Sequence, residues 1–145
     1  MFQRFLPIAL LMSLGLLSSC STTNRAIASK GALAGYRTAS VEARPEDSGD
    51  AGILQEIRTE LSRRGYGIVQ QGAPGRHLVA RIGDTWRWDL VMYLYSLEIE
   101  FIDSSTGAIA AVADYRNSAF HTFPDRRQVV RDLFAQLDAK GVFAK

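Results

Sequence analysis

Few side chains in this sequence have the types and spacing that catalysis or metal binding requires. His77 and His121 are its two histidines, and Cys20 is its one cysteine. Metal sites need ligands at close spacing, such as His-x-x-x-His, and neither histidine has such a partner. The serines form no Gly-x-Ser-x-Gly or Ser-x-x-Lys pattern, and the glycines form no phosphate-binding loop. We therefore predict no catalytic, cofactor-binding or metal-binding residue, and we expect both histidines at the surface or at a strand edge.

The pair Glu98 and Glu100 suggests another kind of chemistry. Side chains two residues apart on a strand project from the same face, and glycosidases use two carboxylates. However, the same two residues alternate with Leu97, Ile99 and Phe101. This alternation is typical of a half-buried strand with one face in water, so we favour the structural interpretation over catalysis.

The amino-terminal residues have the layout of an export signal. Arg4 provides a positive charge, and residues 5–17 then form an apolar run of 13 residues. A helix that spans a bilayer needs about 20 apolar residues, so this run is too short for a permanent transmembrane helix. The run ends in a branched apolar residue, two small residues and a cysteine, Leu17-Ser18-Ser19-Cys20. We expect residues 1–19 to be a signal peptide.

The residues Leu17-Ser18-Ser19-Cys20 resemble the lipobox of bacterial lipoproteins. The resemblance implies a lipid attached to the Cys20 sulfur by a thioether, cleavage before Cys20 and acylation of the new amino terminus. An ordinary secretory signal with a cysteine near its cleavage site is the alternative. Because Cys20 is the only cysteine, the chain has no internal disulfide, and a lipid accounts for the otherwise unpaired thiol. Ser21 after the cysteine resembles lipoproteins sorted to the outer membrane, with the inner membrane as the alternative.

The remainder of the chain predicts one α+β domain. Residues 20–35 are small and polar without a steady period, which predicts a lipidated flexible spacer before a single domain of residues 36–145. Apolar residues at helical spacing predict one helix from a cap at Ser48 or Asp50 to Gly65 and another over 125–140. Strands are predicted at residues 36–43, 66–70, 77–82, 89–102 and 108–115. We expect hairpins between the second and third of these strands and between the last two.

This order of elements favours a two-layer sandwich, with two helices packed on one face of a mostly antiparallel sheet of about five strands. Leu61 and Leu133 lie on the apolar faces of the helices and are expected in the core. The element order, Arg63-Arg64-Gly65-Tyr66 and Trp88-Asp89-Leu90 resemble small exported lipoproteins of unknown function. The chain is similar, more loosely, to the α/β modules of envelope-assembly lipoproteins such as the lipopolysaccharide-translocon plug. The resemblance implies a fold family and no catalytic residue.

The long strand predicts an apolar surface as well as a core. If residues 86–102 form one unbroken strand, its odd-numbered residues Val91, Tyr93, Tyr95, Leu97, Ile99 and Phe101 face the helices. The even-numbered residues then point away from the helices, beginning with Trp86, Trp88, Leu90, Met92 and Leu94. Large exposed apolar patches are usually binding sites, so the first four of these are candidate partner-binding residues. Two alternatives stay open, a bulge that turns Trp86 and Trp88 inward and a spacer that covers the patch.

Charge and motifs together limit the function. A formal net charge of +2, with acids and bases interspersed, gives no basis for nucleic-acid binding. We therefore expect a non-enzymatic, lipid-anchored protein on the periplasmic face of the outer membrane, whose sheet face or edge docks a protein partner in envelope assembly or transport. The alternative is direct binding of an amphiphile or glycan, such as lipopolysaccharide or peptidoglycan, on which Trp86 and Trp88 would stack.

Overall fold

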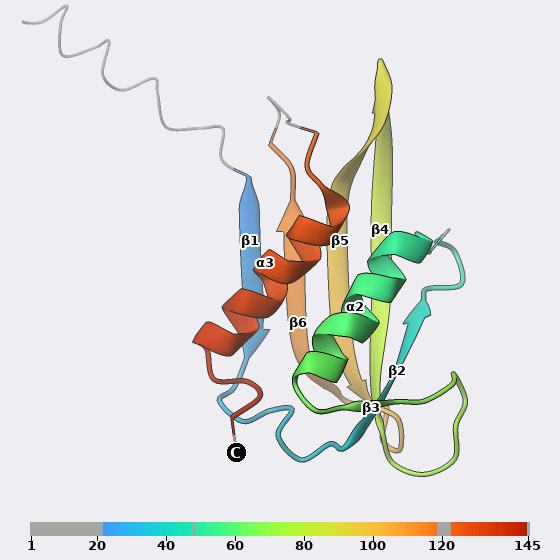
Figure 1. The fold of residues 1–145 in the computed structure, drawn as a ribbon, viewed down its shortest axis with the longest axis vertical. Coiled ribbons are helices and arrows are strands. Elements are labelled where there is room, and N and C mark those ends of the chain that lie inside the picture. The colour runs from blue at the N-terminus through green and yellow to red at the C-terminus, as the bar shows by residue number, and fades with distance from the viewer. Residues whose placement is uncertain (1–21, 48, 119–122, 145) are drawn as a thin grey trace, which may run out of the picture.

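A six-stranded mixed sheet with both helices on one face forms the described part of the chain (Figure 1). The computed structural model describes residues 22–47, 49–118 and 123–144. The strand order across the sheet is β1-β6-β5-β4-β2-β3. In chain order the elements are β1 Thr23–Ala28, β2 Thr38–Ala43, α2 Ala51–Arg63, β3 Gly67–Ile68, β4 Leu78–Asp89, β5 Val91–Asp103, β6 Ile109–Arg116 and α3 Arg126–Ala139.

Both predicted helices are confirmed. Each has local sequence signals that define its start and its buried face. The Asp50 carboxylate caps α2 by accepting a hydrogen bond from the Ile53 backbone nitrogen at 3.0 Å. Asp125 caps α3 in the same way, through the Arg127 backbone nitrogen at 2.9 Å. The apolar faces of α2 and α3 pack against the sheet and form one hydrophobic core with it. Leu61 and Leu133, the two predicted core residues, are fully buried there.

The sheet departs from the predicted antiparallel arrangement around β2. This strand pairs in parallel with both β3 and β4, so it lies between them. The predicted hairpin between residues 66–70 and 77–82 is therefore wrong. After β2 the chain crosses the sheet through α2, so the strands that follow the helix can pair with β2 in parallel. β3 pairs with one edge of β2 and β4 with the other edge. The sheet also has one strand more than expected.

That additional strand, β1, lies in the segment that we expected to be a flexible spacer. It pairs antiparallel with β6 from Thr23 to Ala28, and Ala26 is buried in the core. Leu33 is also fully buried, and its backbone nitrogen donates to the Val142 oxygen at 3.0 Å. The prediction of a flexible segment over 20–35 is thus wrong for its described part, and the folded domain begins before residue 36. Residues 1–19 and Cys20 lie outside the described residues.

Asp103, the last residue of β5, stabilises the turn between β5 and β6. Hydrogen bonds to its carboxylate from Ser105, Arg76 and Tyr36 hold the pKa of Asp103 well below its usual range. This network closes the end of the sheet opposite the β4–β5 turn. No helix among the described residues is long and apolar enough to cross a membrane.

Candidate functional site

Residues 86–102, which we considered as one unbroken strand, in fact fold back on themselves. The chain reverses at Leu90, so Trp86 and Trp88 belong to β4 and Met92 belongs to β5. Asp89 pairs directly with Val91, which leaves Leu90 alone in the turn. Leu90 has a φ of 61°, a left-handed conformation that is strained for any residue with a branched side chain. The tryptophans and Met92 are therefore cross-strand neighbours and not members of one row.

A bulge in β5 decides which way the side chains of Met92 and Leu94 point. Thr85 pairs with Ser96 but Trp86 pairs with Leu94, so Tyr95 has no partner on β4. One additional residue reverses the alternation of side chains along the strand. Leu97 and Leu94 consequently lie on the same buried face, although their numbers differ in parity.

The bulge corrects the two predicted faces of the hairpin. Leu97, Ile99 and Phe101 lie under the helices as predicted, but Val91 and Tyr95 point to the other face. Tyr93 is buried and packs against Phe123. Of the even-numbered residues predicted on the uncovered face, Trp86, Trp88, Met92 and Leu94 lie instead on the side of the sheet that carries the helices. The inward rotation that we left open for Trp86 has occurred, because its side chain packs against the core and its ring nitrogen donates to Asp84 at 2.6 Å.

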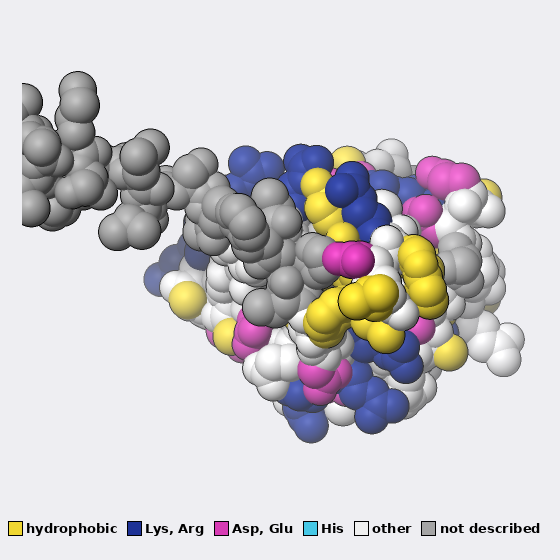
Figure 2. All heavy atoms as spheres, turned by 90° about the horizontal axis from the view of Figure 1, so that it is seen from above, with side chains coloured by type: hydrophobic (Ala, Val, Ile, Leu, Met, Phe, Trp, Pro, Cys, Tyr) yellow, Lys and Arg dark blue, Asp and Glu magenta, His cyan; other side chains and the backbone are white. Residues whose placement is uncertain are grey.

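Beyond Trp86 the hairpin projects past the helices and is uncovered. We define the apolar tip as Trp88, Leu90, Val91 and Met92, which are 71%, 85%, 48% and 57% exposed. Figure 2 looks down on this end of the molecule and shows hydrophobic side chains gathered there, bordered by basic and acidic ones. Three of the four candidate partner-binding residues, Trp88, Leu90 and Met92, are therefore exposed. The fourth, Trp86, packs against the core at the base of the tip.

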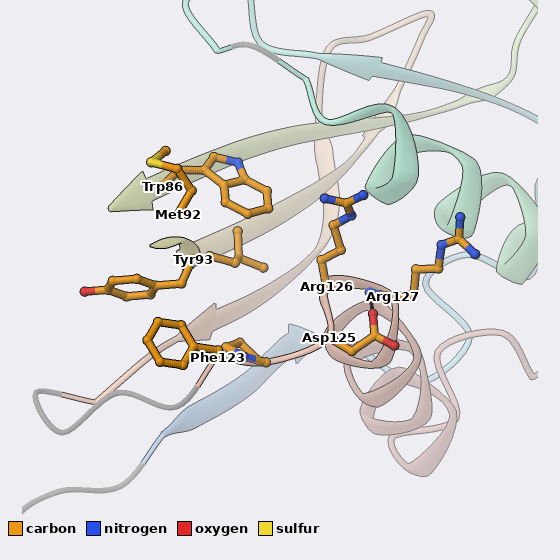
Figure 3. A pocket seen from close by; sticks show the side chains of 9 residues that line it. Trp86, Met92, Tyr93, Phe123, Asp125, Arg126 and Arg127 are labelled. Carbon is orange, nitrogen blue, oxygen red and sulfur yellow. Dashed lines mark hydrogen bonds between the residues drawn. The ribbon is translucent and has the colours of Figure 1, made fainter. Parts of the chain in front are cut away.

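A pocket of about 410 Å³ lies between the hairpin and the start of α3. Figure 3 shows Trp86 and Met92 on its hairpin side, Phe123 below them and Arg126 facing them from the helix. Phe123 packs edge-to-face on Tyr93 with ring centroids 5.8 Å apart. Arg126 is already paired with Asp50 at 3.2 Å, so its charge is partly balanced within the protein.

On the other face of the hairpin, arginines surround the bulge residue. The Arg87 guanidinium lies 3.5 Å from the centre of the Tyr95 ring, and Arg116 lies 5.6 Å from it. A hydrogen bond from Arg116 and the charges of both arginines lower the pKa of the Tyr95 hydroxyl. These contacts stabilise the conformation of β5 at the bulge, from which the tip extends.

The remaining candidate residues make contacts that stabilise the fold. Glu98 and Glu100 lie on the face without helices, and both pair with Arg44. His77 is buried next to β4, contrary to the expected surface position, and its Nδ1 lies 2.9 Å from the Gly75 oxygen. The described residues contain no cluster of three metal-ligating side chains. His121 lies outside them.

Comparison with known proteins reveals likeness in structure alone. No family model and no curated protein matches the sequence. The chain is similar in fold to a PelC subunit. PelC from Paraburkholderia phytofirmans superposes with a TM-score of 0.56 at 17% identity, over 86% of this chain and 100% of that one, in a structure described as a dodecamer of a point variant. A second PelC dodecamer from the same organism gives 0.53 at 16% identity, over 86% and 99% of the two chains. A minor lipoprotein from Acinetobacter baumannii has a TM-score of 0.43 at 17% identity, over 75% and 92%, too distant for any inference.

Sequence reasoning missed two features of this site. The turn at Leu90 lacks glycine, asparagine and proline, and Asp89 is its one residue of a turn-forming type, which is a weak signal inside an apolar run. Phe123 is 57% exposed and lies at the same end as the tip, but it follows a segment without periodicity. Only the pairing of β4 with β5 and the position of α3 bring these residues together.

The two tryptophans are expected to differ in their contribution to stability. Trp86→Ala should lower the free energy of unfolding by about 2–4 kcal/mol, because this ring packs on the core. Trp88→Ala should change it by less than about 0.5 kcal/mol, because its side chain is mostly in water. Urea unfolding of both variants measures the difference. Equal losses would contradict the assignment of Trp88 to an exposed surface.

Proposed function

We propose that this protein is a non-enzymatic lipoprotein of the bacterial envelope that works as one subunit of a larger assembly. In this proposal the lipid on Cys20 holds it at the periplasmic face of the outer membrane, and its sheet docks protein partners that include copies of itself. The supporting observation is the PelC likeness, which extends over 100% of a chain that is described as a dodecamer. The match covers the whole of that subunit, so the fold on which such an assembly is built is present in this chain.

The open edge of β1 is the contact that this proposal assigns to self-association. Among the described residues β1 pairs on one side only, with β6. The backbone groups of its other side are therefore available to a strand from another chain. Ile27 is 55% exposed on this strand, beside the ion pair of Arg25 with Asp114. An exposed apolar side chain on an open edge favours pairing, since natural monomers usually protect such edges with charge.

The expected test is the oligomeric state of the full-length lipoprotein in mild detergent. Wild type should migrate as a defined oligomer by native mass spectrometry, and Ile27→Lys should shift it toward monomer by placing a charge in the contact. Ile68→Lys is the matched control, because Ile68 is also an exposed isoleucine (37%) but lies on β3, at the opposite edge of the sheet. A wild-type protein that is monomeric at all concentrations would contradict the proposal.

Direct binding of an anionic amphiphile or glycan is the second candidate. The observation that favours it is the pocket where Trp86 and Met92 meet Arg126 and Arg127. Apolar groups beside cations suit a ligand with an acyl chain and a negative headgroup. This candidate predicts a monomer whose tryptophan emission changes with lipopolysaccharide, so the same preparation distinguishes it from the first.

A further inference from the structure

The predicted anchor and the apolar tip lie at the same end of the domain. β1 and β5 are each antiparallel to β6, so both strands begin at the same end of the sheet. Thr23 begins β1, and the tip lies at the beginning of β5 (Figure 1). Any membrane that holds a lipid on Cys20 therefore faces the apolar tip.

The register of the sheet measures how far the tip extends. Thr23 and Ser96 both pair with Arg116, so they lie at the same level. Ser96 pairs with Thr85 and Val91 pairs with Asp89, so they lie four positions apart along β4, which corresponds to about 13 Å because the bulge at Tyr95 adds almost no length. The link from Thr23 back to Cys20 is three residues long and spans at most about 11 Å. In an upright domain, even a fully extended link therefore leaves Val91 about 2 Å beyond the Cys20 backbone, and the Leu90 apex lies further out.

The shape of the tip fits a bilayer better than a protein groove. Trp88 and Met92 occupy one flank of the hairpin, Val91 the other flank, and Leu90 its apex. A docking protein covers one flank of a narrow hairpin, whereas lipids surround both flanks. Trp is also a preferred side chain at the level of lipid headgroups.

The charges and the backbone of the turn agree with shallow insertion. Arg87 and Asp89 stand just behind the apex with opposite charges, so the tip brings no net charge toward the lipid. Leu90 retains a large apolar side chain at a φ of 61°, where glycine would avoid the strain. An apolar side chain is thus held at the outermost point of the molecule despite its backbone cost.

We infer that the apolar tip enters the headgroup region of the membrane leaflet that holds the lipid on Cys20, so that the domain has a second, orienting contact with the bilayer. The inference rests on the lipid anchor of the proposed function. The Leu90 apex reaches past the Cys20 backbone, so shallow insertion can bury its apolar side chain at the depth of about 5–10 Å that is typical of interfacial elements. An anchored and oriented domain presents the β1 edge sideways, toward other copies on the same membrane.

Tryptophan quenching by brominated lipids tests this contact in the full-length lipoprotein. The chain has two tryptophans, so Trp86→Phe leaves Trp88 as the sole emitter and Trp88→Phe leaves Trp86. Each variant is reconstituted into vesicles of phosphatidylethanolamine and phosphatidylglycerol, with bromine at the headgroup end of the acyl chains or with none. We expect Trp88 emission to fall about twofold or more in brominated vesicles and Trp86 emission to fall less, because only Trp88 belongs to the tip.

Charged variants at the tip provide the control. Leu90→Asp with Met92→Asp, in the Trp86→Phe background, should remove the quenching while the protein still floats with the vesicles. Ile109→Asp in that background should leave the quenching unchanged, because Ile109 is similarly exposed but distant from the tip. Equal Trp88 emission in both kinds of vesicle, with normal flotation, would overturn the inference and leave the anchor intact. Loss of flotation in wild type would instead overturn the anchor, and the inference with it; the oligomer measurement is independent of both.

Discussion

Replacing Cys20 with serine is expected to abolish fatty-acid labelling of the protein and to release it from the membrane fraction. The expectation follows from the lipobox-like sequence Leu17-Ser18-Ser19-Cys20 and from the absence of any second cysteine. A thioether to lipid requires the thiol, which serine lacks. Metabolic labelling with an alkyne fatty acid, followed by fractionation of the cells, measures both effects.

Ser21→Ala is the matched control for this experiment, since it changes the adjacent residue and keeps the thiol. It should retain the label in full. Equal labelling of wild type and Cys20→Ser would refute lipidation at this position, as would recovery of the wild-type protein wholly in the soluble fraction.

Truncating the core leucines is expected to have the largest effect on stability. Leu61→Ala and Leu133→Ala should each lower the free energy of unfolding by about 2–5 kcal/mol, because both side chains are fully buried between the helices and the sheet. Domains of this size are stable by only about 5–15 kcal/mol, so the double variant should be largely unfolded. Circular dichroism during urea titration measures the loss.

Leu90→Ala is the control for the core variants, because it is the same truncation at a position that is 85% exposed. It should change the free energy of unfolding by less than about 0.5 kcal/mol. Core variants that unfold at the same urea concentration as Leu90→Ala would show that the core lies elsewhere.

The elements that were predicted correctly carry their information locally. The α2 helix has a capping Asp50, apolar residues at helical spacing and Gly65 after its end, where φ is 87°. The β5–β6 hairpin has alternating apolar residues on both sides of a short polar turn. These signals lie within one or two turns or one strand, so neighbouring residues suffice to specify them.

The elements that were missed depend on partners distant in the chain. β1 has the sequence TNRAIA, which contains little apolar surface, and its pairing with β6 makes it a strand. β3 and β4 lie on opposite sides of β2 because α2 returns the chain across the sheet. Strand order of this kind is decided by the packing of all layers and not by the propensity of one segment.

The candidate site shows the same division. From its residues alone, the sequence determined that Trp86, Trp88, Leu90 and Met92 are unusually apolar and that Cys20 has the setting of a lipidation site. Only the tertiary structure decided that the chain reverses at Leu90, which places Trp86 on β4 in the row of core-facing residues, and that the bulge at Tyr95 turns Leu94 toward the core. The physical reason is that a strand has a period of two, so one unpaired residue exchanges its faces, and no local pattern specifies where that residue falls.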